Sequence, residues 1–400
     1  MKTIYLDHNA TTPTRPEVVE AMRQCYADGL ANPASQHQPG QQARRLLEDA
    51  REQIAAVLGV DLAAPRRDRL IFTSGGTEAN NLAVLGISRG QGTSAPSQTQ
   101  TDPPSSRNFS GHIVISAGEH QSVIEPAEHL LEQGWRMDTL GLTPDGVVRI
   151  DQLASFLKPD TRLVSVLLGN HETGVLQPIE ELSAICSDAG VPLHTDAVQV
   201  VGKRPVDFGR LGAAAMSVAA HKFGGPVGIG ALAIRQDVPL QPLLFGGHQQ
   251  SGVRPGTEPV ALAVGMAVAL KLRNAEQHAL AQRLSSLRDR FEQGLRAAAP
   301  GIVVHGVAAP RLPQTSNIAF PGLDGEVLRM ALDLAGVACS VGAACASGST
   351  ELSPTLRAMQ MPNELVTSSL RFSLGATTTE ADIDEAVRRI ASVASELRSK

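Results

Sequence analysis

Aromatic residues make up only 3% of this 400-residue chain, and only one of them is Trp. Proteins that bind single-stranded nucleic acid stack bases on aromatic side chains, and a nucleic-acid surface generally carries an excess of basic residues. The formal net charge here is −5. The sequence therefore predicts no nucleic-acid partner.

Cysteine is scarce as well, and the four cysteines are Cys25, Cys186, Cys339 and Cys345. No two of them form a Cys-x-x-Cys pair, which disfavours both a disulfide framework and a zinc site. We therefore expect no metal. We also expect a reducing cytoplasm, in which any special cysteine acts as a thiol.

Long apolar runs are missing too. No uninterrupted run approaches the roughly 20 residues that a membrane span needs. The N-terminus turns polar by Asp7, unlike a signal peptide. We expect no membrane partner, and a hydrophobic content of 42% suits a globular chain with a large core.

Lysine supplies only six of the 35 basic residues, and one of the six follows an apolar stretch. Lys222 comes just after Ala213–Val218 and before a glycine turn. Arginine cannot lose its proton in a protein, whereas a desolvated lysine can become a neutral nucleophile. A Schiff base with pyridoxal 5′-phosphate (PLP) needs such an amine and an acidic partner for the pyridine nitrogen. Asp196 is the candidate partner, and helix capping is its ordinary alternative role.

Short apolar runs alternate with helical patterns from about residue 65 to residue 235. The predicted strands are Leu70–Ser74, His112–Ala117, Arg136–Leu140, Arg162–Leu168, Pro192–Thr195, Ala214–Ala219 and Ile229–Ile234. The predicted helices between them include Glu78–Ile87, Val123–Gln133 and Ile179–Ala189. This alternation predicts an α/β fold with a mostly parallel seven-stranded sheet and helices on both faces. Ligands of such sheets bind at the carboxyl ends of the strands, where Asp196 and Lys222 fall.

Two domains are expected. Residues 15–260 would form the larger one, with a flexible insertion at 88–110 that is rich in Ser, Gln, Pro and Thr. Residues 1–14 and 261–400 would form a smaller α+β domain, which begins with a long helix from Val260 to Ala299 and ends with a helix from Glu380 to Leu397.

Several residues near the strand ends are candidates for the site. Backbone N–H groups around Gly76 and the Thr77 hydroxyl could cradle a phosphate, although an ordinary turn between strand and helix explains this segment equally well. His120 could stack on a pyridine ring and move protons, and the alternative is a structural histidine. Gln199 lies within reach of a ring substituent, and His221 is a further candidate for phosphate contact.

The remaining candidates lie further along the chain. Thr257 is another candidate for phosphate contact. Arg371 could bind a substrate carboxylate through two hydrogen bonds, and a surface ion pair is its alternative role. Cys345 lies in a small-residue loop that is poor in core side chains, which favours a nucleophilic thiol. Cys339 better suits a small buried hydrophobe.

Taken together, these segments resemble the cysteine desulfurases of the class V aminotransferase family, which are PLP enzymes of fold type I. The resemblance covers nearly the whole chain and rests on an ordered series of motifs. These are Tyr5–Pro13, Asn32–Ser35, Thr73–Glu78, Glu119–His120, Asn170–Gly174, His194–Gln199, His221–Lys222, Arg254–Thr257, the Cys345 loop and Ser369–Gly375.

The resemblance implies a role for each candidate residue. Lys222 would form the Schiff base, Asp196 would pair with the pyridine nitrogen, His120 would stack on the ring and Gln199 would contact its phenolic oxygen. The phosphate would be held by Gly76, Thr77 and His221, joined by Thr257 from a neighbouring subunit. Asn32 and Arg371 would bind the carboxylate of L-cysteine, and Cys345 would accept its sulfur as a persulfide. A homodimer and a sulfur-acceptor or iron–sulfur scaffold partner are also implied.

The chain departs from the family pattern at two positions of the site. His171 stands where the family often has an asparagine and could still donate a hydrogen bond to the cofactor. Ala219 replaces a usual serine, so that one phosphate contact would be missing. Three alternatives stay open: a selenocysteine lyase, another class V aminotransferase, and an inactive relative that serves as a binding subunit. Cys345 argues against an aminotransferase, and the intact set of site residues argues against an inactive relative.

Overall fold

The largest sheet has seven strands. The computed structural model describes residues 2–63, 68–90, 110–342 and 352–399. Within them the hydrogen-bonded strand order is β2-β8-β7-β6-β5-β3-β4. The strands are β2 (Arg69–Thr73), β3 (His112–Ser116), β4 (Arg136–Leu140), β5 (Thr161–Ser165), β6 (Leu193–Asp196), β7 (Ala215–Ala219) and β8 (Gly230–Ile234). Only β8 runs antiparallel to its neighbours, β2 and β7. The predicted mostly parallel seven-stranded sheet is confirmed.

Alternate side chains of each strand enter different cores, because successive residues point to opposite faces of a sheet. On β3, Ile113 and Ile115 pack into one core, and Val114 packs into the other. Both faces are therefore buried, which explains why the strands are nearly continuous apolar runs.

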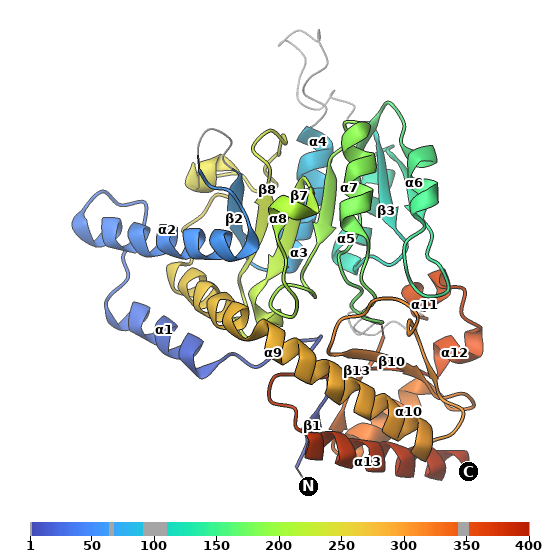
Figure 1. Cartoon of the computed structure of the whole chain (residues 1–400). Helices are drawn as coiled ribbons and strands as arrows, with labels where there is room; N and C mark the ends of the chain where they lie inside the picture. Colours follow the sequence, from blue (N-terminus) through green and yellow to red (C-terminus); the bar gives the residue numbers. More distant parts are fainter. Residues whose placement is uncertain (1, 64–67, 91–109, 343–351, 400) are drawn as a thin grey trace.

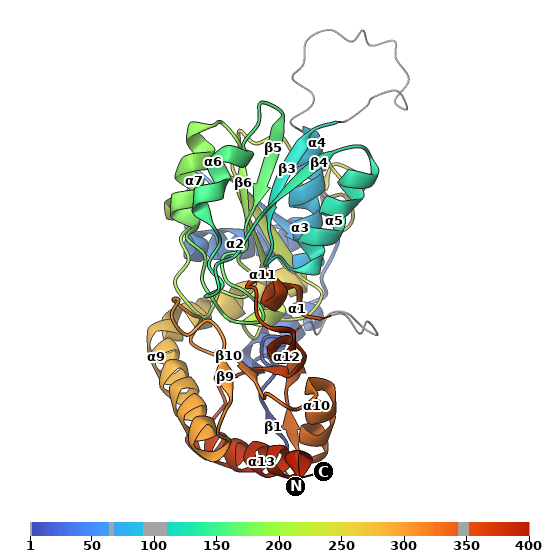
Figure 2. The same ribbon diagram turned by 90° about the vertical axis from the view of Figure 1, so that its right-hand side faces the viewer.

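Helices cover both faces of this sheet (Figure 2). One face packs against α3 (Gly76–Asn81), the π-helical segment η1 (Leu82–Ile87) and α5 (Gln121–Glu132). The other packs against α2 (Gln38–Leu58), α6 (Ile150–Phe156) and α7 (Ile179–Asp188). The shorter or more peripheral helices are α1 (Pro16–Ala27), α4 (Ser88–Gly90) and α8 (Phe208–Leu211). The predicted fold class, with helices on both faces, is thus confirmed.

The predicted insertion begins too early. Ser88–Gly90 forms α4 and continues the helical path of α3 and η1, and both Ser88 and Gly90 are buried. A Cβ atom on Gly90 would lie 2.7 Å from the carbonyl oxygen of Pro239, so the helix is packed closely there. The prediction of a flexible surface segment is therefore wrong for 88–90, and residues 91–109 lie outside the described residues.

A smaller antiparallel sheet lies beside the first one (Figure 1). Its strand order is β12-β13-β10-β9, and a parallel pair of β1 with β11 accompanies it. These strands are β1 (Ile4–Tyr5), β9 (Val303–Val304), β10 (Thr315–Ala319), β11 (Val337–Ala338), β12 (Ser340–Val341) and β13 (Ser369–Ser373). The helices α10 (Gly325–Leu334) and α13 (Glu380–Arg398) share the core of this sheet. The short helices α11 (Pro354–Ala358) and α12 (Asn363–Thr367) instead place Leu356 and Val366 in the core of the larger sheet.

The long helix α9 (Val260–Ala298) joins the two sheets, as Figure 1 shows. Its first half supplies Met266 and Leu270 to the core of the larger sheet. Its second half supplies Phe291 and Leu295 to the core of the smaller one. The two cores are thus built on one continuous helix, and the domain boundaries drawn from the sequence stay a prediction.

No helix in the described part of the chain is both long enough and apolar enough to cross a membrane.

Candidate active site

A cavity of about 240 Å³ opens at the carboxyl ends of β6 and β7. It collects eight of the residues singled out from the sequence, although they are spread over about 150 positions. The eight are Gly76, Thr77, His120, His171, Asp196, Gln199, His221 and Lys222. Parallel strands bring their carboxyl ends to one edge, which is why residues that follow different strands meet here.

Lys222 ends the short 3-10 helix η4 (Ala220–Lys222), directly after β7. Its Nζ atom donates to the carbonyl oxygens of Asn9, at 2.5 Å, and Ala10, at 2.9 Å. The backbone of the N-terminal segment runs beside it, because the N–H of Thr12 donates to the carbonyl of His221. The amine is thus held by two carbonyl oxygens from a segment more than 200 residues away.

Asp196 is the last residue of β6, and it is only 7% exposed. One carboxylate oxygen accepts the N–H of Val198 at 2.9 Å, and the other accepts Nδ2 of Asn80 at 2.7 Å. Asn80 lies on α3 and also donates to the Ser122 hydroxyl. Two fixed donors hold this carboxylate in place, so it offers an acceptor in the cavity.

His120 precedes α5 and caps it, because its Nδ1 accepts the N–H of Ser122 at 3.1 Å. The His171 ring lies edge-on to it, with ring centroids 5.2 Å apart. Burial holds the pKa of His171 well below its ordinary value, and the positive charges of His120, Arg371 and Lys222 lower it further. His171 is therefore neutral at physiological pH and can offer one donor and one acceptor.

The start of α3 lies against the loop that follows Asp196. A Cβ atom on Gly76 would lie 3.0 Å from Val198, so glycine allows this close approach. Nδ1 of His221 lies 3.2 Å from the Thr11 hydroxyl oxygen. Burial lowers the pKa of His221 to about 4, assisted by the nearby lysine charges. The methyl group of Ala219 also lines the cavity, where it offers no hydrogen bond.

Three predicted site residues of the described part of the chain are not among the residues that line this cavity. Arg371 on β13 is buried, donating to Asp7 Oδ1 at 2.7 Å and to the His171 carbonyl at 3.2 Å. Asn32 and Thr257 are exposed in loops, and Asn32 accepts the N–H of Ala34. Cys345 lies outside the described residues.

Sequence reasoning passed over three polar residues that support the cavity. The Asn9 backbone N–H donates to the Ser373 hydroxyl at 2.8 Å, and its side chain donates to the Thr315 hydroxyl at 2.9 Å. Asn80 orients Asp196, and its position one helical turn after Gly76 could have indicated this. Lys203 is 8% exposed and is described below.

Glu119 belongs to one of the sequence motifs, but sequence reasoning gave this buried acid no role of its own. Glu119 accepts the Leu167 N–H at 2.8 Å and the Ser116 hydroxyl. Burial raises its pKa to about 8, and the charge of Asp196 adds to this. Glu119 therefore keeps its proton at neutral pH. The Asp196 carboxylate, in contrast, accepts hydrogen bonds from Asn80 and Val198.

The chemistry of these groups fits PLP. A carboxylate with fixed donors suits a protonated ring nitrogen, and the Lys222 amine suits an aldehyde. The amide of Gln199 can donate to a phenolic oxygen. Backbone N–H groups at the start of α3, with the Thr77 hydroxyl, suit a phosphate.

Comparisons with known proteins agree with this arrangement. The model of the family "Aminotransferase class-V" matches residues 4–386. The chain is 38% identical to "Cysteine desulfurase IscS" of Dictyoglomus turgidum, over 99% of this chain and 95% of that protein. It is 41% identical to "IscS-like cysteine desulfurase" of Mycobacterium tuberculosis, over 96% and 94%. A solved structure of a "NIFS-like protein" superposes with a TM-score of 0.88 at 30% identity, covering 99% of this chain and all of the other.

Proposed function

Because the chain belongs to the aminotransferase class-V family, we propose that it is a PLP-dependent cysteine desulfurase that converts L-cysteine to L-alanine. The observation that carries the proposal is the meeting of the Lys222 amine and the Asp196 carboxylate in one cavity. Near-complete coverage by relatives with the name cysteine desulfurase supports the choice of reaction.

Bound PLP would supply an electron sink for bonds at the substrate α-carbon. Asp196 would accept a hydrogen bond from the protonated ring nitrogen, and the donors Asn80 and Val198 keep its carboxylate fixed for this purpose. Gly76, Thr77 and His221 would bind the phosphate, joined by Thr257 of a second subunit. His120 would lie over the ring, and Gln199 would donate to the phenolic oxygen.

Lys222 would hold the cofactor through its amine and move the α-proton of the substrate. The carbonyl oxygens of Asn9 and Ala10 accept from this amine, so they give it a position to which it can return after substrate displaces it. His171 would donate one further hydrogen bond in the cavity. Because its pKa is strongly lowered, it adds no competing charge.

The sulfur step is assigned to Cys345. The substrate's Cβ–S bond breaks and an S–S bond forms with the Cys345 thiolate, while Cβ takes a proton and leaves as the methyl group of L-alanine. Burial raises the pKa of Cys186 and of Cys339 to about 12, so both thiols stay protonated and are poor nucleophiles.

Arg371 and Asn32 would bind the substrate carboxylate. Arg371 is only 3% exposed, and its Nε atom has no hydrogen-bond partner among the described residues. An arginine with a spare buried donor is suited to a carboxylate, since the pairing satisfies a group that is costly to leave unpaired. Its hydrogen bond to the His171 carbonyl ties it to the wall of the cavity.

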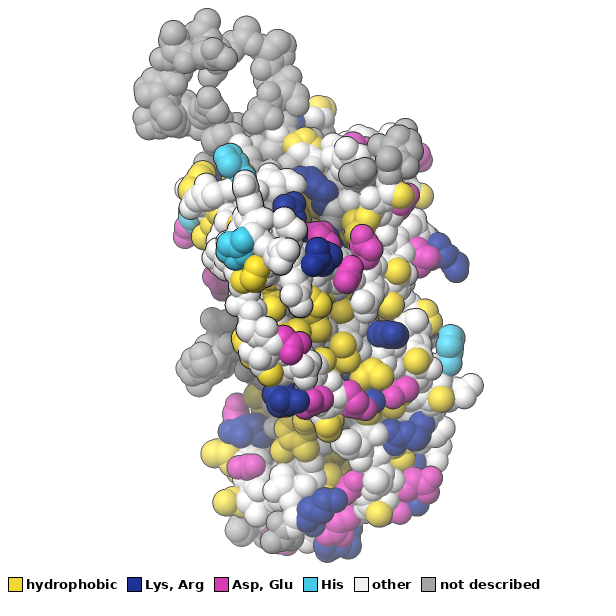
Figure 3. Space-filling model, turned by 90° about the vertical axis from the view of Figure 1, so that its left-hand side faces the viewer, with side chains coloured by type: hydrophobic (Ala, Val, Ile, Leu, Met, Phe, Trp, Pro, Cys, Tyr) yellow, Lys and Arg dark blue, Asp and Glu magenta, His cyan; other side chains and the backbone are white. Residues whose placement is uncertain are grey.

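A homodimer is the assembly we propose, in the cytoplasm, with a sulfur-acceptor or iron–sulfur scaffold protein as recipient of the persulfide. Figure 3 shows hydrophobic side chains across the middle of the face on the α1 and α2 side of the molecule. Val19 and Tyr26 of α1 are 53% and 63% exposed, and Phe245 is 91% exposed. Large apolar side chains left open in this way are typical of a surface that meets another protein.

The proposal is tested with the purified protein, PLP and L-cysteine. The protein should be coloured by bound PLP and should release equal amounts of alanine and, with a thiol reductant, sulfide. Cys345→Ala should keep the colour and release no sulfide, while the matched variant Cys339→Ala keeps both. Borohydride reduction followed by peptide mapping should label Lys222.

Other outcomes would favour the alternatives. A protein that PLP cannot colour, and that leaves Lys222 unlabelled, would be an inactive relative that serves as a binding subunit. Sulfide release that survives Cys345→Ala would contradict the role of that thiol. Transfer of the amino group of cysteine to a keto acid, with no release of sulfide, would favour another class V aminotransferase. A strong preference for selenocysteine over cysteine would indicate a selenocysteine lyase.

A further inference from the structure

Lys203 is a second buried lysine beside the site, and the proposed mechanism does not use it. It follows Asp196 by seven positions and is only 8% exposed. Its Nζ atom donates to Oε1 of Gln199 at 2.7 Å. Within the described residues it forms no ion pair with a carboxylate, which is uncommon for a buried lysine.

The backbone explains why this lysine turns inward. Gly202 has a φ of +76°, and a Cβ atom there would lie 2.5 Å from Cβ of Phe223. Only glycine allows both the left-handed conformation and the close approach. The next side chain, Lys203, is thereby buried, and its N–H donates to the carbonyl of Val200.

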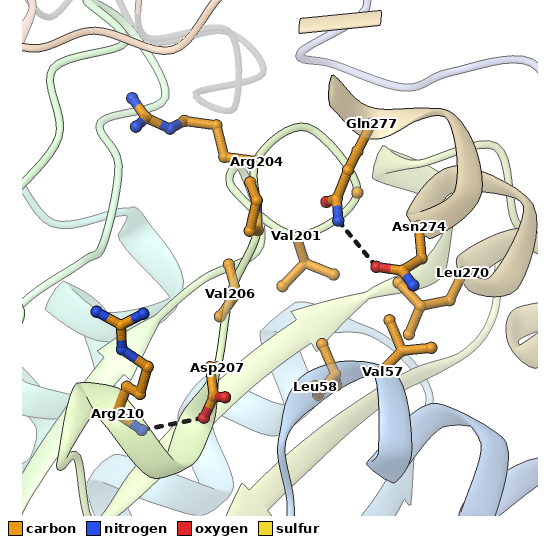
Figure 4. Close-up of a pocket in the computed structure, with 12 residues that line it drawn as sticks. Val57, Leu58, Val201, Arg204, Val206, Asp207, Arg210, Leu270, Asn274 and Gln277 are labelled. Atoms are coloured by element: carbon orange, nitrogen blue, oxygen red, sulfur yellow. Dashed lines mark hydrogen bonds between the residues drawn. The ribbon is translucent and has the colours of Figure 1, made fainter. Parts of the chain in front are cut away.

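A neighbouring cavity of about 270 Å³ shows how Lys203 differs from the adjacent Arg204 (Figure 4). It is lined by Val201, Gly202, Arg204 and Val206, and Lys203 is not among its lining residues. Arg204 is exposed, whereas Lys203 is buried against Gln199. Two adjacent basic residues thus lie on opposite sides of the same segment.

Gln199 connects Lys203 to the Lys222 amine. Nζ of Lys203 donates to the amide oxygen of Gln199, so this oxygen points toward the lysine. The amide nitrogen then donates to the carbonyl oxygen of Asn9 at 2.9 Å. Lys222 donates to this same carbonyl oxygen at 2.5 Å, so the two side chains share one acceptor.

We propose that Lys203 is a positioning residue that acts on the Lys222 amine through the Gln199 amide and the Asn9 carbonyl, and that it keeps Lys222 reactive as a neutral amine. The inference rests on the proposed function, in which Lys222 is the nucleophile toward the PLP aldehyde. Lys203 holds Gln199 on the Asn9 carbonyl, which leaves less of that acceptor for a charged Lys222. It also fixes the second N–H of the Gln199 amide in the cavity wall.

The charges around Lys222 act in the same direction. Lys203, Arg371 on β13 and Arg273 on α9 are buried basic groups. Burial holds the pKa of Lys203 well below its ordinary value, and Lys222, Arg273 and Arg371 lower it further. Two carboxylates of the site already have partners, since Asp7 pairs with Arg371 and Asp196 accepts from Asn80 and Val198.

The histidines nearby, His8 in the N-terminal segment and His221 beside Lys222, add no positive charge. Burial lowers the pKa of each to about 4, so both are neutral at physiological pH. Removing Lys203 therefore removes one basic group and frees the Asn9 carbonyl. Both effects stabilise a charged Lys222 and raise its pKa.

The test compares Lys203→Met with Arg204→Met. Methionine has a similar length and no donor, so it fills the buried space without the amine, and Arg204→Met removes a charge from the adjacent exposed position. The first measurement uses cofactor-free protein: the rate at which Lys222 reacts with acetic anhydride is followed by peptide mapping as a function of pH. The acetylation midpoint is the pH at which this rate reaches half of its maximum. We expect it to rise by about one pH unit in Lys203→Met and to stay at the parent value in Arg204→Met.

The second measurement is the dissociation constant of PLP from its visible absorption. Lys203→Met should bind PLP about tenfold more weakly than the parent. A factor of this size is typical of the loss of one buried hydrogen bond, here the bond from Lys203 to Gln199. Parent values in both measurements for Lys203→Met would overturn the proposal. If the parent itself took up no PLP, the proposed function would fail, and the acetylation midpoints alone would decide the role of Lys203.

A double-mutant cycle guards against a purely structural explanation. Gln199→Leu removes the amide through which Lys203 acts, so adding Lys203→Met to it should raise the acetylation midpoint by less than Lys203→Met does alone, because only the effect of the lost basic group remains. Additive shifts would show that Lys203 acts by another route and would contradict the proposal. If Lys203→Met alone folds poorly, Lys203→Leu, which also lacks a donor, can replace it in the same scheme.

Discussion

Replacing Glu119 by Gln should remove a dependence of stability on pH that the buried carboxyl group imposes. Burial raises the pKa of Glu119 from 4.5 to about 8, outweighing the hydrogen bonds from Ser116 and Leu167 that lower it. Between these two values the folded protein keeps the proton and the unfolded chain releases it. Because the unfolded state then binds fewer protons, the free energy of unfolding falls as pH rises.

The magnitude follows from the same pKa values. The slope reaches at most about 1.4 kcal/mol per pH unit, so the contribution lost between about pH 5 and about pH 7 is roughly 3 kcal/mol. The stability that Glu119 provides is complete below about pH 4.5 and is lost as the pH passes about 8. Glutamine keeps the size and the donor of the protonated side chain but does not titrate.

Urea unfolding at a series of pH values, followed by circular dichroism at constant salt, measures the effect. The difference in stability between Glu119→Gln and the parent should grow in favour of the variant as pH rises. Glu128→Gln, at an exposed position of the following helix α5, is the control and should follow the parent. A difference that stays constant across this range would show that Glu119 is ionised in the folded protein and refute the reasoning.

Two further predictions concern the site and the smaller core. Asn80→Ala removes a donor from the Asp196 carboxylate and should weaken PLP binding about tenfold or more, as measured by absorption titration; unchanged binding would contradict the role of Asn80. Phe372→Ala empties a fully buried position beside Phe291 and Phe320, whose ring centroids lie 5.1 and 6.5 Å away. It should cost about 3–5 kcal/mol of stability in a denaturation experiment, and a loss under about 1 kcal/mol would mean that the core collapses around the gap.

The parallel sheet could be predicted because both of its faces are buried. Such strands are continuous apolar runs, and helical patterns separate them, so the strands are recognisable without tertiary information. Asp196 and Lys222 each follow one of these strands. Their meeting at one edge of the sheet therefore follows from the topology, before any side-chain contact is known.

Other parts of the site leave no local pattern in the sequence. The N–H of Asn9 bonds to the hydroxyl of Ser373, which lies 364 positions away, and no periodicity marks either residue. Lys203 lies in a polar turn that is typical of a surface, and its burial depends on the close approach of Gly202 to Phe223. Ser88 lies in a polar segment, but its helix is buried by elements distant in sequence.

The N-terminal segment has a consequence for how the protein is made. Its first residues cannot take up their final place until the chain's far end exists, because Leu6 and His8 bond to the backbone of Ser373. The carbonyl groups that hold the Lys222 amine belong to this same segment. Strand β13 must therefore be synthesised before the Lys222 amine gains its two acceptors. A nascent chain in which the larger sheet has already folded still lacks the completed site.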